Sequence, residues 1–285
     1  MCTVTFIPRD LGYHLAVNRD EQLARIAGLP PQLKFLNERS ILYPSEPTGG
    51  TWISLNDARV TFALVNWYSV AERVRGGAVS RGQVVKGTSS AGKSDEADKK
   101  VASLPLNFIN PFRLIGVFPD ERAVVEWRWD LKKLVRRNCE WKPQQWISSG
   151  HDEPKAQSFR SSTFRRALQK RSAGTLKWLQ QLHASHDPER GPFSTCMHRA
   201  DAATVSYTAI CVARERGLMK YHAGSPCMPR QQAVRNVEIS FATLERRGRT
   251  AKNPLGALRR VTGLSGEGAE MRSWGCGRNS TPAPS

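Results

Sequence analysis

The chain has 285 residues, of which 39% are hydrophobic, enough for one large domain or two small ones with a substantial core. Its 43 Lys and Arg residues exceed its 25 Asp and Glu residues, and the resulting net charge of +18 raises the question of a nucleic-acid partner. No apolar run approaches the roughly 20 residues of a membrane-spanning helix, and the apolar stretch Val4–Ile7 is too short for a secretory signal, so we expect a soluble, cytoplasmic protein.

A cysteine directly follows the initiator methionine. Because cysteine is small, we expect Met1 to be removed, which would leave Cys2 with both a thiol and a free α-amine. Such an amine has a reference pKa of about 7.7–8.0, so part of it is neutral at working pH and can accept the thiol proton. Cys2 would then be nucleophile and base in one residue. The alternative is that this cysteine stands at position 2 by chance and does no chemistry.

Two short strands are predicted next, Thr3–Ile7 and Tyr13–Val17, joined by a turn. The second strand ends in the polar tetrapeptide Asn18-Arg19-Asp20-Glu21. An antiparallel hairpin brings this end beside Cys2. There, the guanidinium of Arg19 would favour the thiolate, and the carboxylate of Asp20 would orient both Arg19 and the terminal ammonium. The alternative is a solvated strand end with a surface ion pair, which contributes little to stability.

The rest of the chain alternates strand-like runs with a few helical patterns. Further strands are predicted over residues 51–55, 60–68, 114–118, 123–128, 145–149, 193–198, 204–212 and 218–222, with turn residues between them. Helices are predicted over residues 81–86, 95–102, 161–171 and 175–184. Helices inserted between blocks of antiparallel strands are typical of an α+β fold.

Residues 155–186 form a basic segment with seven Lys and Arg residues and no Asp or Glu. The basic side chains Arg160, Arg165, Arg166, Lys170, Arg171 and Lys177 could face phosphates. No nucleic-acid-binding motif accompanies them, so we favour a solvated helix face and consider nucleic-acid binding unlikely.

The character of the chain changes at about residue 226. Residues 226–285 hold ten Lys and Arg residues and four Asp and Glu residues, and apolar periodicity is low towards the end. We therefore predict one domain over residues 1–225 and a basic C-terminal extension that is largely disordered from about residue 265. The six cysteines and six histidines show no C-x-x-C pair and no zinc-type spacing, so we predict neither a metal site nor a cofactor.

The tetrapeptide and three further motifs resemble the NRDE family, also called the transport-and-Golgi-organisation family. These motifs are the segment YPSEPTGGTWI at residues 43–53, the strand Val60–Tyr68, and Ser80-Arg81-Gly82. The resemblance covers roughly residues 1–225. The family is in turn similar to N-terminal-nucleophile hydrolases that begin with Met-Cys, such as bile-salt hydrolases and penicillin V acylases. It implies an αββα sandwich, two antiparallel sheets between helix layers.

The resemblance also implies site residues. In the acylases an Arg and an Asp closely follow the first hairpin, as Arg19 and Asp20 do here, although Arg-Asn precedes their Asp where this chain has Asn18-Arg19. An Asn that ends a later strand helps to form their oxyanion hole, and Asn66 matches it. We expect Asn18 to brace the strand end. Arg199 either completes this polar cluster or is a turn residue that packs on Asp201.

Two classes of function remain open. The first is a cysteine N-terminal-nucleophile hydrolase that cleaves a non-peptide amide or acyl bond through Cys2, with Asn66 or backbone N–H groups near residues 148–151 stabilising the oxyanion. The second is a non-catalytic binding or trafficking protein that holds an apolar metabolite, such as haem or an acyl thioester, on the same fold, because the family is associated with haem and lipid handling. The intact set of Cys2, Arg19, Asp20 and Asn66 favours the first.

Overall fold

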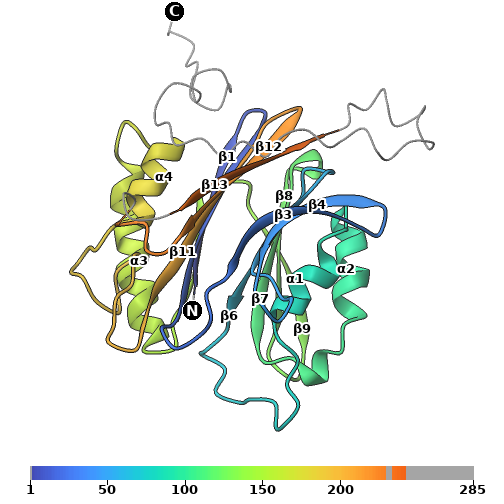
Figure 1. The fold of residues 1–285 in the computed structure, drawn as a ribbon, viewed down its shortest axis with the longest axis horizontal. Helices are drawn as coiled ribbons and strands as arrows, with labels where there is room; N and C mark the ends of the chain where they lie inside the picture. The colour runs from blue at the N-terminus through green and yellow to red at the C-terminus, as the bar shows by residue number, and fades with distance from the viewer. Residues whose placement is uncertain (1, 229–232, 242–285) are drawn as a thin grey trace, which may run out of the picture.

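The computed structural model describes residues 2–228 and 233–241. These residues form four layers, in which two antiparallel sheets pack face to face and two helices cover the outer face of each sheet (Figure 1). The αββα sandwich that the sequence predicted is confirmed. No helix in this part of the chain is both long and apolar enough to cross a membrane.

The first sheet has the strand order β10-β1-β2-β11-β12-β13. Its strands are β1 (Cys2–Arg9), β2 (Gly12–Gln22), β10 (Gln144–Ser148), β11 (Ala202–Val212), β12 (Arg216–Ala223) and β13 (Val234–Ser240). The N-terminal hairpin β1–β2 therefore lies inside the sheet, between two strands that come much later in the chain. In this register Cys2 is opposite Arg19 of β2 on one side and Ser148 of β10 on the other.

The second sheet has the order β3-β4-β5-β6-β7-β8-β9. Its strands are β3 (Leu29–Leu36), β4 (Arg39–Ser45), β5 (Ile53–Asn56), β6 (Thr61–Asn66), β7 (Phe112–Phe118), β8 (Ala123–Trp129) and β9 (Leu134–Cys139). Each strand follows its neighbour in the sequence, so this sheet is a simple meander.

Alternation along the strands produces three apolar layers. In β1, Val4 and Phe6 enter the core between the two sheets, whereas Ile7 packs in the layer beneath the helices. In β6, Val65 faces the inter-sheet core and Leu64 faces the opposite helix layer. Successive strand residues point to opposite faces, so a residue's odd or even position decides which layer it joins.

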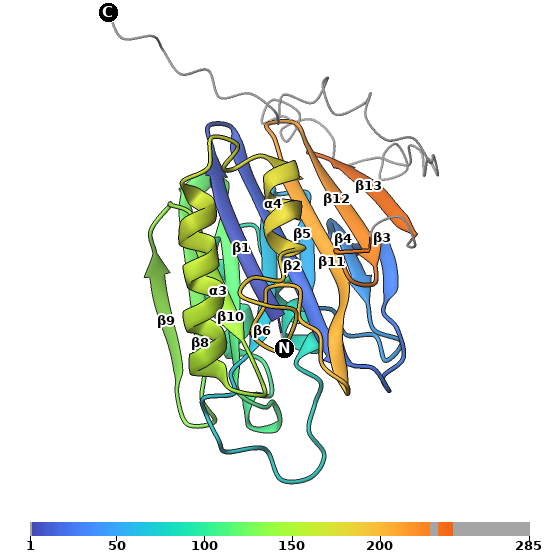
Figure 2. The same ribbon diagram turned by 90° about the vertical axis from the view of Figure 1, so that its left-hand side faces the viewer.

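Helices α1 (Gly82–Thr88) and α2 (Ser94–Ala102) cover the second sheet (Figure 1), and α3 (Glu153–Leu168) and α4 (Leu176–His183) cover the first (Figure 2). Two short 3-10 turns, η1 (Leu106–Phe108) and η2 (Pro119–Glu121), lie in connections of the second sheet. Asp152 caps α3 by accepting a hydrogen bond from the Lys155 N–H at 2.9 Å. Thr175 caps α4 by accepting from the Trp178 N–H at 3.1 Å. These caps satisfy backbone donors that have no partner within the helix.

The structure corrects several element predictions. Residues 193–198 were predicted to be a strand but form turns and bends, apart from a single bridge between His198 and Ala203. Helix α3 begins at Glu153, eight residues before the predicted start at residue 161. Strands β3, β4, β9 and β13 were not predicted. Because β13 pairs with β12 along its length, the first sheet continues beyond the predicted domain boundary at residue 225. The disorder predicted from about residue 265 lies outside the described residues.

Candidate functional site

Cys2 is the first residue of β1, and its side chain lies at the end of the inter-sheet core with 8% of its surface exposed. Residues directly opposite each other in antiparallel strands point to the same face, so Arg19 and Ser148 flank the thiol. The Ser148 Oγ is buried and has no hydrogen-bond partner among the described residues. This hydroxyl is therefore available to bond a group that binds at Cys2.

The guanidinium of Arg19 is held in place from several sides. Its Nη2 lies 2.8 Å from Glu46 Oε1 and 3.3 Å from Glu21 Oε2, and its Cζ lies 4.7 Å from the centre of the Trp52 ring. Arg25 pairs in turn with Glu21 at 2.8 Å. The side chain of Arg19 is only 6% exposed, so it presents a fixed positive charge beside the thiol.

Burial dominates the acidity of the Cys2 thiol. It raises the pKa of Cys2 above its usual value, and the nearby carboxylates of Asp20 and Glu21 act in the same direction. The positive charge of Arg19 lowers the pKa of Cys2, but by less than burial raises it. Arg19 therefore favours the thiolate, as the sequence predicted, but burial has the larger effect on the pKa of Cys2.

The tetrapeptide lies beside Cys2, as the hairpin predicted, but its side chains are divided between the two faces of the sheet. Asn18 and Asp20 lie on the opposite face of the sheet from Arg19 and Glu21, because neighbouring strand residues point in opposite directions. The Asn18 Nδ2 donates hydrogen bonds of 2.8 Å to the carbonyl oxygens of His183 and Thr195. Asn18 therefore braces this region, but it joins β2 to the helix layer and does not contact the thiol.

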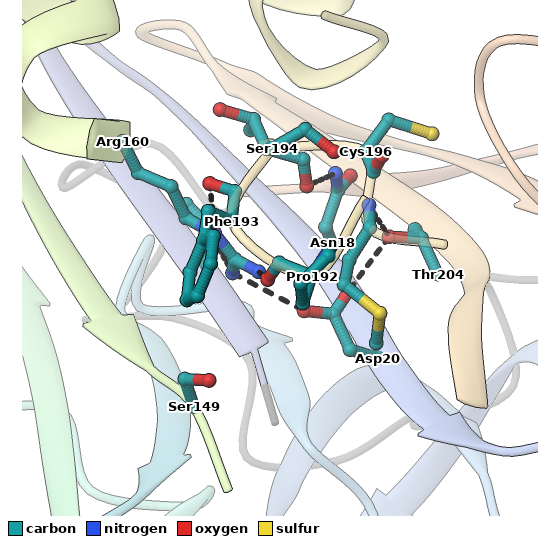
Figure 3. A network of polar contacts seen from close by, with 12 residues as sticks. Asn18, Asp20, Ser149, Arg160, Pro192, Phe193, Ser194, Cys196 and Thr204 are labelled. Atoms are coloured by element: carbon teal, nitrogen blue, oxygen red, sulfur yellow. Dashed lines mark hydrogen bonds and ion pairs between the residues drawn. The ribbon is translucent and has the colours of Figure 1, made fainter. Parts of the chain in front are cut away.

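Asp20 forms a buried ion pair with Arg160 of α3, at 3.2 Å between Oδ2 and Nη1 (Figure 3). Both side chains are 0% exposed. Arg160 also donates to Thr3 Oγ1 at 2.7 Å, and Asp20 Oδ1 accepts from Thr204 Oγ1 at 2.6 Å. Asp20 thus joins α3, β1 and β11. The interpretation of Arg160 as part of a solvated basic face is wrong, although Arg165, Arg166, Lys170, Arg171 and Lys177 are exposed as expected.

Asn66 ends β6 and donates a hydrogen bond of 2.9 Å from Nδ2 to the hydroxyl of Tyr68. The guanidiniums of Arg73 and Arg81 lie 5.7 and 6.0 Å from the centre of the Tyr68 ring. Burial alone would raise the pKa of Tyr68, but positive charges nearby, including Arg81, and the bond from Asn66 outweigh burial and lower it. Tyr68 and Arg81 both lie within electrostatic range of the Cys2 thiol. Asn66 is therefore connected to the surroundings of Cys2 through Tyr68.

Arg199 does not join this group. Its Nη2 lies 2.8 Å from Asp201 Oδ2, and the Asp201 side chain is 59% exposed. Arg199 is therefore the turn residue of the alternative interpretation, and the prediction that it completes the polar cluster is corrected.

Sequence reasoning assigned no role to Glu46, Tyr68 or Arg81, and it gave Ser148 a role only through backbone donors. Glu46, Tyr68 and Arg81 belong to motifs that carried the family resemblance, so their positions were visible in the sequence. Their proximity to Cys2 was not, because it depends on how the two sheets pack. The sequence also predicted no metal site, whereas the described residues place the potential metal ligands His186, Cys196, His198 and Cys227 with their ligand atoms within 4.8 Å of one another.

Comparisons with known proteins agree with this architecture. The family described as Transport and Golgi organisation 2, which is the NRDE family, matches residues 1–127. No curated protein matches the chain. The C2A mutant of conjugated bile acid hydrolase from Clostridium perfringens aligns with a TM-score of 0.50 and 8% identity over 85% of this chain and 97% of that chain. Penicillin V acylase from Agrobacterium tumefaciens aligns with a TM-score of 0.50 and 10% identity over 84% of this chain and 86% of that chain.

At such low identities the two enzymes show a common fold alone. The chain thus matches the Transport and Golgi organisation 2 family over residues 1–127, as its motifs predicted, and it shares its fold with a bile acid hydrolase and a penicillin V acylase.

Proposed function

We propose that the protein is a cysteine N-terminal-nucleophile hydrolase that cleaves a non-peptide amide or acyl bond through Cys2. The observation that carries this proposal is the placement of Cys2. It begins a central strand of this fold, its thiol lies at the end of the inter-sheet core, and it has a fixed guanidinium on one side and an unpartnered hydroxyl on the other.

The reaction requires removal of Met1, after which the α-amine belongs to Cys2 itself. The amine takes the thiol proton as the sulfur attacks the carbonyl carbon of the substrate, which forms a tetrahedral oxyanion. Collapse of this intermediate breaks the amide or acyl bond, and the proton passes from the ammonium to the leaving group. Water then hydrolyses the thioester, releases the acid and restores the thiol. Because burial raises the pKa of the Cys2 thiol, we assign the amine as the base that takes its proton.

The oxyanion needs hydrogen-bond donors that are fixed before the reaction. We assign this role to the Asn66–Tyr68 pair and to Ser148. The Tyr68 hydroxyl accepts a bond from Asn66, so its own hydrogen remains to be donated. The Ser148 Oγ is buried opposite Cys2 without a partner among the described residues.

The charges near Cys2 favour a substrate that carries an anionic group. Arg19 is neutralised by Glu21 and Glu46, whereas Arg73 and Arg81 both lie beside the Tyr68 ring. We therefore propose that Arg81 binds a carboxylate or another anion on the acyl or leaving-group side. Asp20 is assigned a positioning role, because its carboxylate holds α3 and β11 on the sheet that contains Cys2.

The test is a panel of acyl-amide and acyl-thioester substrates, with and without a carboxylate. We expect Cys2→Ala to abolish turnover and Cys2→Ser to keep a small fraction, because a hydroxyl is the poorer nucleophile. Loss of one oxyanion donor costs about 10²–10³ in kcat, so Asn66→Ala and Tyr68→Phe should fall between wild type and Cys2→Ala. Intact mass shows whether Met1 has been removed.

The matched control is Cys139→Ser, which changes another free, half-buried cysteine on β9. It should turn over substrate like the wild type. Turnover by Cys2→Ala at the wild-type rate, on any substrate that responds, would refute catalysis by Cys2.

A second function is favoured by the burial of the thiol, since buried cysteines of raised pKa are usually unreactive. In that case the same region holds an apolar metabolite such as haem or an acyl thioester. Equal, tight binding of such a ligand to wild type and Cys2→Ala, with no turnover of the panel, would favour this binding function over hydrolysis.

A further inference from the structure

Four side chains with metal-binding atoms meet outside the region around Cys2. His186 follows α4, Cys196 and His198 lie in the irregular segment before β11, and Cys227 follows β12. Their ligand atoms lie within 4.8 Å of one another. Three segments of the chain therefore supply two thiols and two imidazoles to one point.

The spacing of these atoms matches that of a tetrahedral metal site. Around zinc, with Zn–S about 2.3 Å and Zn–N about 2.0–2.1 Å, neighbouring nitrogen and sulfur ligands are about 3.5 Å apart. The His198 Nε2 lies 3.5 Å from Cys196 Sγ and 3.5 Å from Cys227 Sγ. Both cysteines carry free thiols, so no disulfide accounts for their proximity.

Burial and missing partners point to a ligand at the same place. Cys196 is 0% exposed. The His186 Nε2 is buried and has no hydrogen-bond partner among the described residues, which is costly unless another group binds it. The centres of the His186 and His198 rings are 5.1 Å apart, in an edge-to-face arrangement.

The backbone around the ligands is already fixed. The Cys196 N–H donates to the Ser185 carbonyl at 2.9 Å, and the His198 N–H donates to the Gly191 carbonyl at 3.1 Å. On the Cys227 side, the Ser225 Oγ donates to the Thr204 carbonyl at 2.7 Å. A preformed ligand set loses little conformational entropy when the metal binds.

We propose that His186, Cys196, His198 and Cys227 bind one Zn²⁺ ion in a closed, structural site. Two thiolates and two imidazoles in tetrahedral spacing are a donor set that zinc prefers over magnesium or calcium, which require oxygen ligands. Four protein ligands leave no open position for substrate, so the ion stabilises the structure and has no part in hydrolysis. Binding releases the two thiol protons to solvent.

The proposed site also gives the tetrapeptide a second connection. Met197, which stands between two of the ligands, donates its N–H to Thr204 Oγ1 at 2.9 Å, and Thr204 donates to Asp20 at 2.6 Å. The zinc ion would thus join the segment between α4 and β11 to Cys227, which follows β12. This junction would lie close to the carboxylate of Asp20, which holds α3 through Arg160.

The experiment measures metal content and coordination in the whole protein. The chain is purified without chelators under reducing conditions, and its zinc is measured by mass spectrometry of the metal. We expect about one zinc per chain. Replacement by cobalt should give a thiolate-to-cobalt charge-transfer band in the near ultraviolet together with the strong visible bands of tetrahedral cobalt.

The variants Cys196→Ser and Cys227→Ser should lose most of the zinc, whereas Cys139→Ser should keep it. Cys227→His, which keeps four ligands, should retain the metal and weaken the cobalt charge-transfer band because one thiolate is gone. This variant separates the loss of a ligand from misfolding.

Three results would overturn the proposal. These are a wild-type protein that takes up neither zinc nor cobalt, full zinc content in both Cys→Ser variants, and a Cys196–Cys227 disulfide in the protein isolated from cells under conditions that trap thiols.

Discussion

Arg19 and Asp20 are neighbours in the chain, but their side chains leave β2 on opposite faces. Arg19 faces the thiol of Cys2 and is held by Glu46, whereas Asp20 faces the helices and is held by Arg160. A motif that reads as one catalytic cluster in the sequence is divided by strand alternation into a part near the nucleophile and a part that anchors the helix layer. Substitutions at the two positions should therefore have different effects.

Asp20→Asn should destabilise the fold. It leaves the fully buried guanidinium of Arg160 without a counter-charge, and breaking such a pair costs about 3–5 kcal/mol. We expect the free energy of unfolding in urea to fall by that amount. Asp201→Asn is the control, because its pair with Arg199 is exposed and contributes about 0–1 kcal/mol. Similar losses in the two variants would contradict the buried-pair assignment.

Glu46→Gln should act on the other face. It removes the 2.8 Å charge contact that fixes Arg19, while the amide keeps nearly the same shape. We expect slower alkylation of Cys2 by limiting iodoacetamide or lower turnover, with a smaller loss of stability than Asp20→Asn. If Glu46→Gln loses less stability than Asp20→Asn but leaves the reactivity of Cys2 unchanged, Arg19 does not influence the thiol.

Two buried histidines should make stability depend on pH. Burial lowers the pKa of His14 to about 4 and that of His183 to about 3, well below the ordinary histidine value of about 6.5. At a pH between the lowered pKa values of the folded protein and the ordinary pKa of the unfolded chain, the unfolded chain binds more protons. The contribution of these histidines to the free energy of unfolding is therefore complete above about pH 6.5 and is lost as the pH falls towards 4. Each histidine contributes at most about 1.4 kcal/mol per pH unit.

His14→Gln should make this decline shallower. Unfolding is followed in urea from pH 7 to 4, with His151→Gln, an exposed site, as the control. If His14→Gln left the slope unchanged and His151→Gln reduced it, the assignment of acid sensitivity to buried His14 would be wrong.

At the scale of elements, the sequence predicted strands that are buried and alternate cleanly, such as β1, β2, β6 and β11. It missed β3, which contains Pro30 and Pro31. Prolines cannot donate to the hydrogen-bond ladder, and they are tolerated here because β3 is an edge strand whose register shifts between Leu29 and Gln32. Edge strands have weaker alternation, since only one neighbour constrains them.

The irregular segment before β11 was predicted as a strand because residues 193–198 are mostly small or apolar. In the structure these residues fold on themselves through bonds such as Ser194 Oγ to the Cys196 carbonyl, at 2.7 Å. Side chains that form hydrogen bonds with nearby backbone groups compete with the backbone hydrogen bonds that pair strands. The potential metal ligands within this segment escaped notice for a related reason, because Cys227 is 29 residues from His198 and no short motif joins them.

At the scale of the molecule, the four-layer architecture followed from the motifs, but the surroundings of Cys2 did not. Arg19 was predictable because a hairpin fixes its register with Cys2. Ser148 reaches the same region from β10, Trp52 from the connection before β5, and Tyr68 from the loop after β6. Their convergence depends on the order of strands in the first sheet and on how the two sheets pack, and neither is encoded in local patterns.

The interior position of the N-terminal hairpin also limits when the protein can fold. During synthesis β1 and β2 leave the ribosome first, but β10 and β11, which flank them, end at Ser148 and Val212. The outer edge of β1 stays unpaired until β10 has been made, about halfway along the chain, and that of β2 until β11 has been made, about three quarters along it; contacts of such long sequence separation form slowly. Cys2, the earliest-made residue of the proposed active centre, is thus enclosed only after strands from the second half of the chain have been made.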